Sequence, residues 1–153
     1  MLAALALSAA ACAPSQPTRD AQSGEITEAV DDADVFALRV GDCLGSYGEG
    51  ESTSVPTVPC GEAHQEEVFA STDLPDGDFP DDDARMARAE DGCMLASTEF
   101  GGLAYDDSVL DITTIEPTEQ SWTDGDREVL CLVHDPRRRG HRQPRGRPAL
   151  SRR

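Results

Sequence analysis

Five cysteines and the histidine at position 64 are the residues of this sequence whose types and spacing could do chemistry. His64 follows Cys60 by four residues and precedes Glu66 and Glu67, so its imidazole could bind a metal or act as a base. No two cysteines form a Cys-x-x-Cys motif, and no tight Cys/His cluster occurs along the chain. We therefore expect no metal site, and we interpret His64 as a turn residue whose imidazole is hydrogen-bonded.

Cys12 ends a segment with the features of an export signal. Residues 1–11 (MLAALALSAAA) are an uninterrupted run of apolar and small residues. The run is shorter than the roughly 20 residues that a transmembrane helix needs, but it suits the hydrophobic region of a signal peptide. The segment from Leu7 to Cys12 resembles a bacterial lipobox, which implies that Cys12 becomes the lipidated first residue of the mature chain.

Two features depart from that signal. Ala9 stands where a leucine is usual, and no Lys or Arg precedes the apolar run. We therefore expect the natural start to lie upstream of Met1. The alternative is an ordinary secretory signal cleaved near Ala11 or Ala13, which would make the protein secreted instead of lipid-anchored on the extracellular face of the cell membrane.

With Cys12 lipidated, an even number of cysteines remains, which in a small exported domain predicts two disulfides. Four cysteines permit three pairings, and sequence alone does not choose among them. We favour Cys43–Cys60, which closes a short hairpin-like loop, and Cys93–Cys131, which joins a helix to the last strand. Paired thiols would leave no free cysteine for nucleophilic catalysis.

The elements that must position these residues follow from hydrophobic periodicity. A helix is expected over residues 81–100, because apolar residues there recur at spacings of three and four and form one face. The residues of this face are Met86, Ala89, Cys93, Ala96 and Phe100. Gly92 weakens the helix but allows close packing. Aspartates 81–83 complement the helix dipole at its start.

Strands are expected over residues 35–44, 66–71, 109–115 and 128–134. The first has Phe36, Leu38 and Val40 at a spacing of two, which is the pattern of a half-buried strand. Residues 55–60 contain two prolines and can form only an edge or irregular strand. The order predicts an α+β fold: a small antiparallel sheet of about four strands with one packed helix and two disulfides.

Charge divides the chain into segments. The formal net charge is −17, and all 30 acidic residues precede residue 136, whereas the last 17 residues contain only basic charges. An acidic domain over residues 35–135 disfavours a nucleic-acid partner. Residues 12–34 are poor in large apolar residues and predict a disordered tether. Residues 136–153 are interpreted as a frameshifted tail, with a genuine basic tail that binds anionic envelope polymers or headgroups as the alternative.

Two further features could bind ligands. Trp122 could be an exposed recognition residue, although a tryptophan more often caps the core. A run of carboxylates could bind calcium, but it lacks the EF-hand spacing, so a solvated loop and helix start are favoured. The carboxylates of this run are Asp73, Asp76, Asp78, Asp81, Asp82 and Asp83.

The landmarks together resemble a known family. They are VFALRVGDCL from Val35, VPCGEAHQEEVFA from Val58, a helix with one cysteine, and WTDGDR followed by VLCLV. This series resembles the septum formation domain of cell-envelope proteins from high-GC Gram-positive bacteria, over about residues 35–135. The resemblance implies a cell-envelope location and a link to septum formation in cell division. It brings no catalytic residues with it.

We therefore expect a non-enzymatic domain, anchored to the membrane by lipid and without a cofactor, that binds or scaffolds unidentified envelope or division proteins. The first alternative is an extracellular sensor for a small molecule, a peptide or calcium. The second is a hydrolase that acts through His64 and carboxylates, and no further catalytic set in the sequence supports it.

Overall fold

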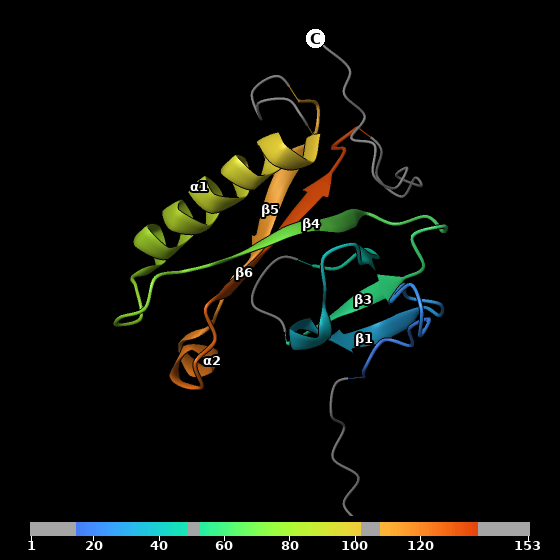
Figure 1. Cartoon of the computed structure of the whole chain (residues 1–153), viewed down its shortest axis with the longest axis horizontal. Coiled ribbons are helices and arrows are strands. Elements are labelled where there is room, and N and C mark those ends of the chain that lie inside the picture. The colour runs from blue at the N-terminus through green and yellow to red at the C-terminus, as the bar shows by residue number, and fades with distance from the viewer. Residues whose placement is uncertain (1–14, 49–52, 102–107, 138–153) are drawn as a thin grey trace, which may run out of the picture.

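One antiparallel sheet and one long helix form the part of the chain that the computed structural model describes, residues 15–48, 53–101 and 108–137 (Figure 1). In chain order the elements are β1 (Val30–Asp34), a 3-10 helix η1 (Val35–Ala37), β2 (Cys43–Leu44), β3 (Ser54–Val58), β4 (Glu66–Asp73), α1 (Asp82–Gly101), β5 (Asp111–Ile115), α2 (Glu119–Thr123) and β6 (Glu128–His134). The export signal, Cys12 and residues 138–153 of the basic tail lie outside the described residues.

The sheet has the strand order β1-β3-β2-β4-β6-β5. All of its neighbouring strands are antiparallel. The predicted α+β class, with one packed helix on an antiparallel sheet, is therefore confirmed. The predicted number of about four strands is wrong, because the described residues form six. One added strand, β1, comes from the segment that we expected to be disordered.

The long strand predicted over residues 35–44 is wrong. Val35–Ala37 form η1, and only Cys43–Leu44 join the sheet. Phe36 is 64% exposed and Val40 is 56% exposed, so their alternation with Leu38 does not mark a buried face. Local hydrogen bonds explain the difference, because the Asp34 carboxylate accepts from the backbone N–H of Phe36 at 3.0 Å and turns the chain before a strand can form.

The disordered tether predicted over residues 12–34 is wrong for residues 15–34, which fold against the domain. β1 pairs with β3, and Ile26 is buried. The Arg19 guanidinium donates to both carboxylate oxygens of Asp42, at 2.6 and 2.7 Å. The prediction of disorder rested on the small number of apolar residues in this segment. Composition gives no information about an ion pair such as Arg19–Asp42, whose partners lie far apart in the sequence.

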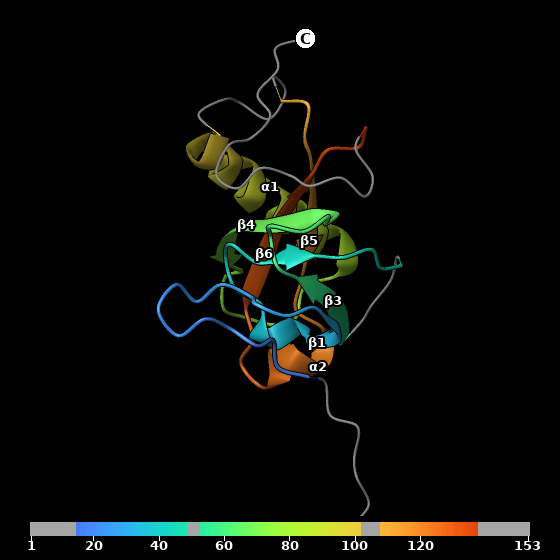
Figure 2. The ribbon, with the colours of Figure 1, turned by 90° about the vertical axis from the view of Figure 1, so that its right-hand side faces the viewer.

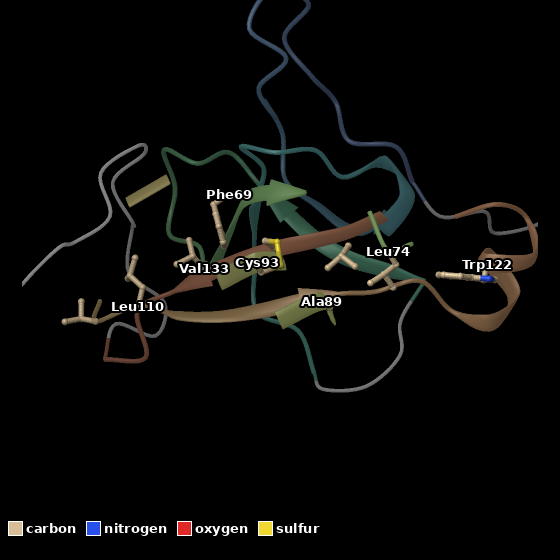
Figure 3. Packing of buried hydrophobic residues seen from close by; sticks show 10 residues of the cluster. Phe69, Leu74, Ala89, Cys93, Leu110, Trp122 and Val133 are labelled. Carbon is tan, nitrogen blue, oxygen red and sulfur yellow. A yellow bond between two sulfur atoms is a disulfide. The ribbon is translucent and has the colours of Figure 1, made fainter. Parts of the chain in front are cut away.

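Helix α1 covers one face of the sheet and forms the larger hydrophobic cluster with it (Figure 3). Ala89 and Cys93 are fully buried, and Cys93 is bonded to Cys131 of β6 with the two Cα atoms 5.4 Å apart. The other disulfide joins Cys43 to Cys60. Both favoured pairings are thus confirmed. Met86, predicted on the buried face of the helix, is 46% exposed, so that part of the prediction is wrong.

The opposite face of the sheet is covered by strand β3 and by residues that flank β2, among them Leu38 and Tyr47. Val55 of β3 packs in one cluster with Leu130 and Leu132 of β6, although two strands separate β3 from β6. The sheet must therefore curl toward this face. In both views the β1–β3 end lies on the side of β4 away from α1 (Figures 1 and 2). In the described part of the chain, no helix is both long and apolar enough to traverse a membrane.

Gly92 is expected to be required for the contact between α1 and β4. A Cβ atom at Gly92 would lie 2.9 Å from Cγ2 of Thr72, a short and stiff side chain. Gly92→Ala should therefore lower the free energy of unfolding, although alanine favours a helix over glycine by about 1 kcal/mol. Urea unfolding should show that Thr72→Ser, which removes Cγ2, reverses the loss. Equal destabilisation by Gly92→Ala in both backgrounds would contradict this close-packing account.

Candidate functional site

The His64 cluster is the group formed by Cys43, Cys60, His64 and Glu67. Cys43 and Glu67 are direct partners in the antiparallel ladder between β2 and β4, so their side chains share one face of the sheet. The Cys43–Cys60 disulfide ties the turn after β3 to this position, with Cα atoms 5.2 Å apart. The turn that follows Cys60 then carries His64 to the same place.

The two ring nitrogens of His64 differ, because one is hydrogen-bonded and the other has no partner among the described residues. His64 is 2% exposed. Nδ1 lies 2.9 Å from the carbonyl oxygen of Glu62, so the Nδ1–H tautomer donates a hydrogen bond within the turn, as the turn interpretation predicts. Nε2 is buried and has no hydrogen-bond partner among the described residues. A buried nitrogen without a hydrogen-bond partner lowers the stability of the fold by about 1–3 kcal/mol. Nε2 is therefore a candidate atom for binding a ligand.

Glu67 is buried beside this histidine. It is 6% exposed, and its carboxylate makes no hydrogen bond or ion pair within the described residues. Burial raises the pKa of Glu67, because removal from water disfavours the charged carboxylate. A ring nitrogen of His64, a carboxylate oxygen of Glu67 and the sulfur of Cys43 lie within 4.8 Å of one another. The cluster that sequence spacing did not reveal is thus assembled by the fold.

A second site, the Glu66 cleft, lies on the other face of the sheet and is defined by Tyr47, Glu66, Thr113 and His134. The cleft has a volume of about 670 Å³. The Tyr47 hydroxyl donates to Oε2 of Glu66, and the Thr113 hydroxyl donates to Oε1 at 3.0 Å. Nδ1 of His134 lies 3.7 Å from Oε1. One buried carboxylate therefore gathers polar groups from the loop after β2, from β5 and from β6.

The remaining walls of the Glu66 cleft combine apolar side chains with one ion pair. Val35, Val55 and Ile115 provide apolar surface. The Arg85 guanidinium of α1 donates to the Glu116 carboxylate at 3.0 Å. A few fixed polar groups among apolar walls are the usual composition of a binding site.

Tyr47→Phe is expected to lower the free energy of unfolding at pH 7 by about 1–2 kcal/mol, because Glu66 loses its phenolic donor. Burial, and then the hydrogen bond to Glu66, raise the pKa of Tyr47 above its usual range. This stabilisation is therefore complete below pH about 10, where an unfolded tyrosine ionises, and is lost as the pH rises further.

Urea unfolding at pH 7 and in more alkaline buffers would test this expectation for Tyr47. Tyr105→Phe, the same change at the other tyrosine of the sequence, is the matched control. The variant Tyr47→Phe should lose less stability than the wild type between the two conditions. Identical alkaline losses in both proteins would contradict the role given to Tyr47.

Trp122 is part of the core and not an exposed recognition residue. It is 7% exposed, and its indole N–H donates to the carbonyl oxygen of Gly77 at 3.1 Å. The Arg127 guanidinium carbon lies 3.6 Å from the centre of the ring system and covers it. Figure 3 shows Trp122 at the end of the cluster that α1 covers. The interpretation of Trp122 as a cap on the core therefore fits its position.

The acidic run considered for calcium has partners within the protein. The Asp76 carboxylate pairs with Arg127 at 3.2 Å, and the Asp82 carboxylate pairs with Arg85 at 2.8 Å. The Asp81 carboxylate accepts from the backbone N–H of Ala84 at 2.9 Å. These three carboxylates serve two ion pairs and a cap at the start of α1.

Sequence reasoning did not find the Glu66 cleft. Glu66 and Val68 lie on one face of β4 by the two-residue period of a strand, and Thr113 and Ile115 do so on β5. This two-residue period can be recognised in the sequence of each strand. The register that brings these faces together across β6 is a long-range property, and sequence alone does not supply it.

Comparisons with known proteins agree with the landmarks of the sequence. The family model described as septum formation matches residues 9–114 and residues 40–151. No curated protein and no solved structure matches the chain. The two matches together span most of the sequence, including both disulfides, the His64 cluster and the Glu66 cleft. The chain therefore belongs to the septum formation family.

Proposed function

We propose that this chain is a non-enzymatic domain, held on the outer face of the cell membrane by a lipid on Cys12, that contributes to septum formation by binding an envelope or division protein. Family membership supports a role in septum formation and a cell-envelope location. The observation that carries the binding proposal is the Glu66 cleft. Both disulfides support export, because such bonds persist in oxidising compartments.

The Glu66 cleft suits recognition because its polar groups are already oriented. Glu66 is 5% exposed, and hydrogen bonds from Tyr47 and Thr113 fix its carboxylate. A partner that enters the cleft would meet a fixed acceptor and a histidine without first ordering mobile side chains. Preorganisation of this kind reduces the entropy lost on binding.

The burial of His64 supports a function without catalysis. A general base must come within about 2.6–3.2 Å of the proton that it removes, directly or through one water. His64 is 2% exposed, and its Nδ1 donates to the carbonyl oxygen of Glu62. The four cysteines of the domain are paired and are not available as nucleophiles.

Complementation of a deletion strain would test the proposal. The strain would express the wild type, Cys12→Ala, Thr113→Val, or Thr98→Val, and septa would be counted and positioned by microscopy. Thr98 is exposed on α1, so Thr98→Val is the matched control for the cleft variant. We expect the wild type and Thr98→Val to restore normal septa and the other two variants to fail. Full restoration by Cys12→Ala and Thr113→Val, at equal protein levels, would refute the proposal.

The volume of the Glu66 cleft favours a second candidate function, an extracellular sensor of a small ligand. Its volume of about 670 Å³ lies within the range of about 300–1,000 Å³ that small-molecule sites have. Thermal unfolding with cell-wall fragments or calcium at millimolar concentrations would distinguish this candidate. A rise in Tm that Thr113→Val abolishes would support a sensor, and an unchanged Tm with every ligand would count against it.

A further inference from the structure

We propose that reduction of the Cys43–Cys60 disulfide converts the His64 cluster into a Zn²⁺ site, with Cys43, Cys60, His64 and Glu67 as its four ligands. The disulfide sulfurs are not ligands in the oxidised protein, so the site exists only in the reduced state. The proposal concerns the face of the sheet opposite the Glu66 cleft and does not depend on the function proposed for that cleft.

The first support is the placement of the donor atoms. The sulfur of Cys43, a ring nitrogen of His64 and a carboxylate oxygen of Glu67 lie within 4.8 Å of one another. The sulfur of Cys60 is bonded to that of Cys43 and so lies at the same place. Ligand atoms of tetrahedral zinc are about 3.3–3.8 Å apart, as follows from bonds of about 2.0–2.3 Å. Side-chain shifts of about 1 Å would therefore complete the site.

The second support is the orphaned nitrogen of His64, which is independent of the distances. Histidines that bind metals usually donate their other ring N–H to a carbonyl or carboxylate, which fixes the tautomer. His64 has this arrangement, because Nδ1–H donates to the carbonyl oxygen of Glu62 at 2.9 Å. Its Nε2 then carries a lone pair, is buried, and has no hydrogen-bond partner among the described residues.

The donor set determines the metal. Two thiolates, one imidazole and one carboxylate form a mixed set of sulfur, nitrogen and oxygen that suits Zn²⁺ and does not suit Ca²⁺ or Mg²⁺, which prefer oxygen ligands. Cys43 and Glu67 are held opposite each other by the β2–β4 ladder, and His64 is held by its turn. Most of the site therefore stays in place when the sulfur–sulfur bond breaks.

The conversion requires a dithiol reductant. Its two thiols transfer two electrons and two protons to the Cys43–Cys60 bond, which breaks to give two thiols, while the reductant leaves as its own disulfide. Zn²⁺ then displaces the protons of both thiols to solvent and binds the two thiolates. The metal thus replaces the covalent crosslink between the start of β2 and the turn after β3, so the loop stays closed in both redox states.

Titration of the full chain with Co²⁺, a spectroscopic substitute for Zn²⁺, would test the site. Fully reduced protein should bind one Co²⁺ with thiolate-to-cobalt absorption and strong visible bands of tetrahedral geometry, and Zn²⁺ should displace it. Oxidised protein should show neither feature. His64→Ala should weaken binding at least about tenfold, whereas His134→Ala should leave it unchanged. Cys93→Ala/Cys131→Ala should retain the cobalt spectrum, and Cys43→Ala/Cys60→Ala should lose it.

The fold of the reduced protein must be followed in the same experiment by Trp122 fluorescence and circular dichroism. If reduction unfolds the chain, recovery of the native spectra on addition of Zn²⁺ would support the site, because metal binding then drives folding. Reduced protein that stays folded without binding Co²⁺, or that stays unfolded with Zn²⁺, would overturn the proposal. So would equal Co²⁺ binding in the oxidised protein or in His64→Ala.

Discussion

Replacing Cys93 and Cys131 together by alanine is expected to lower the free energy of unfolding by about 4 kcal/mol, the largest effect that we predict for any change in this domain. The two cysteines are 38 residues apart in sequence, so their bond strongly restricts the unfolded chain. Both are fully buried where α1 meets β6. A small domain has a total stability of only about 5–15 kcal/mol, so the variant should lose a quarter or more of its stability. Urea unfolding followed by Trp122 fluorescence would measure the loss.

Two comparisons separate the crosslink from packing. Cys43→Ala/Cys60→Ala opens a shorter loop, with a separation of 17 residues, and should cost about 3 kcal/mol. Cys93→Ala/Cys131→Val restores buried volume without restoring the crosslink and should remain nearly as destabilised as the double alanine variant. Recovery of most of the stability by the valine variant would show that packing, and not the disulfide, supports the joint between α1 and β6.

Arg19→Ala is expected to lower the free energy of unfolding by about 3 kcal/mol, because it leaves the Asp42 carboxylate buried without its counter-charge. The side chains of Arg19 and Asp42 are only 12% and 4% exposed. The Arg19 guanidinium also donates to the carbonyl oxygen of Ala37 at 2.8 Å, so its loss removes a second contact that holds residues 15–34 to the domain. Urea unfolding would give the energy, and limited proteolysis should cut the variant within residues 15–34 first.

Arg88→Ala is the matched control for Arg19, because Arg88 is exposed on α1. It should change stability by less than about 0.5 kcal/mol. In a double-mutant cycle, Arg19→Ala with Asp42→Asn should lose less than the sum of the single losses, because the two residues interact directly. Additive losses, or protease resistance of residues 15–34 in Arg19→Ala, would contradict the account of how this segment is held.

The features that were predicted correctly from the sequence depend on local residue spacing or on the number of cysteines. Helix α1 follows from apolar residues at spacings of three and four, and its bounds agree with the structure within about one residue. The disulfides follow from an even number of cysteines, together with one expected turn and one expected helix. The irregular strand near the prolines became β3, which has β1 and β2 as neighbours. Each of these predictions used either local spacing or a count of residues, and none required the register of the sheet.

The features that the sequence missed depend on residues far apart along the chain. Residues 15–34 became ordered because Arg19 meets Asp42, 23 positions later. Glu66 receives a hydrogen bond from Thr113, 47 positions later, and no periodicity reveals such a pair. His64 seemed isolated from other ligands because only the β2–β4 register sets Cys43 opposite Glu67. Long-range register therefore determines both candidate sites, whereas local patterns determine the scaffold that carries them.

Mass spectrometry of the native protein, extracted unreduced from its own membranes, tests the central claim that this is a lipid-anchored, disulfide-bonded domain of the cell envelope. Intact mass and peptide mapping would report the amino terminus, its modification and the disulfides together. The account predicts a mature chain that begins at Cys12 with a lipid attached, and linked peptides for Cys43–Cys60 and Cys93–Cys131. An unprocessed amino terminus together with free thiols at all four domain cysteines would contradict it.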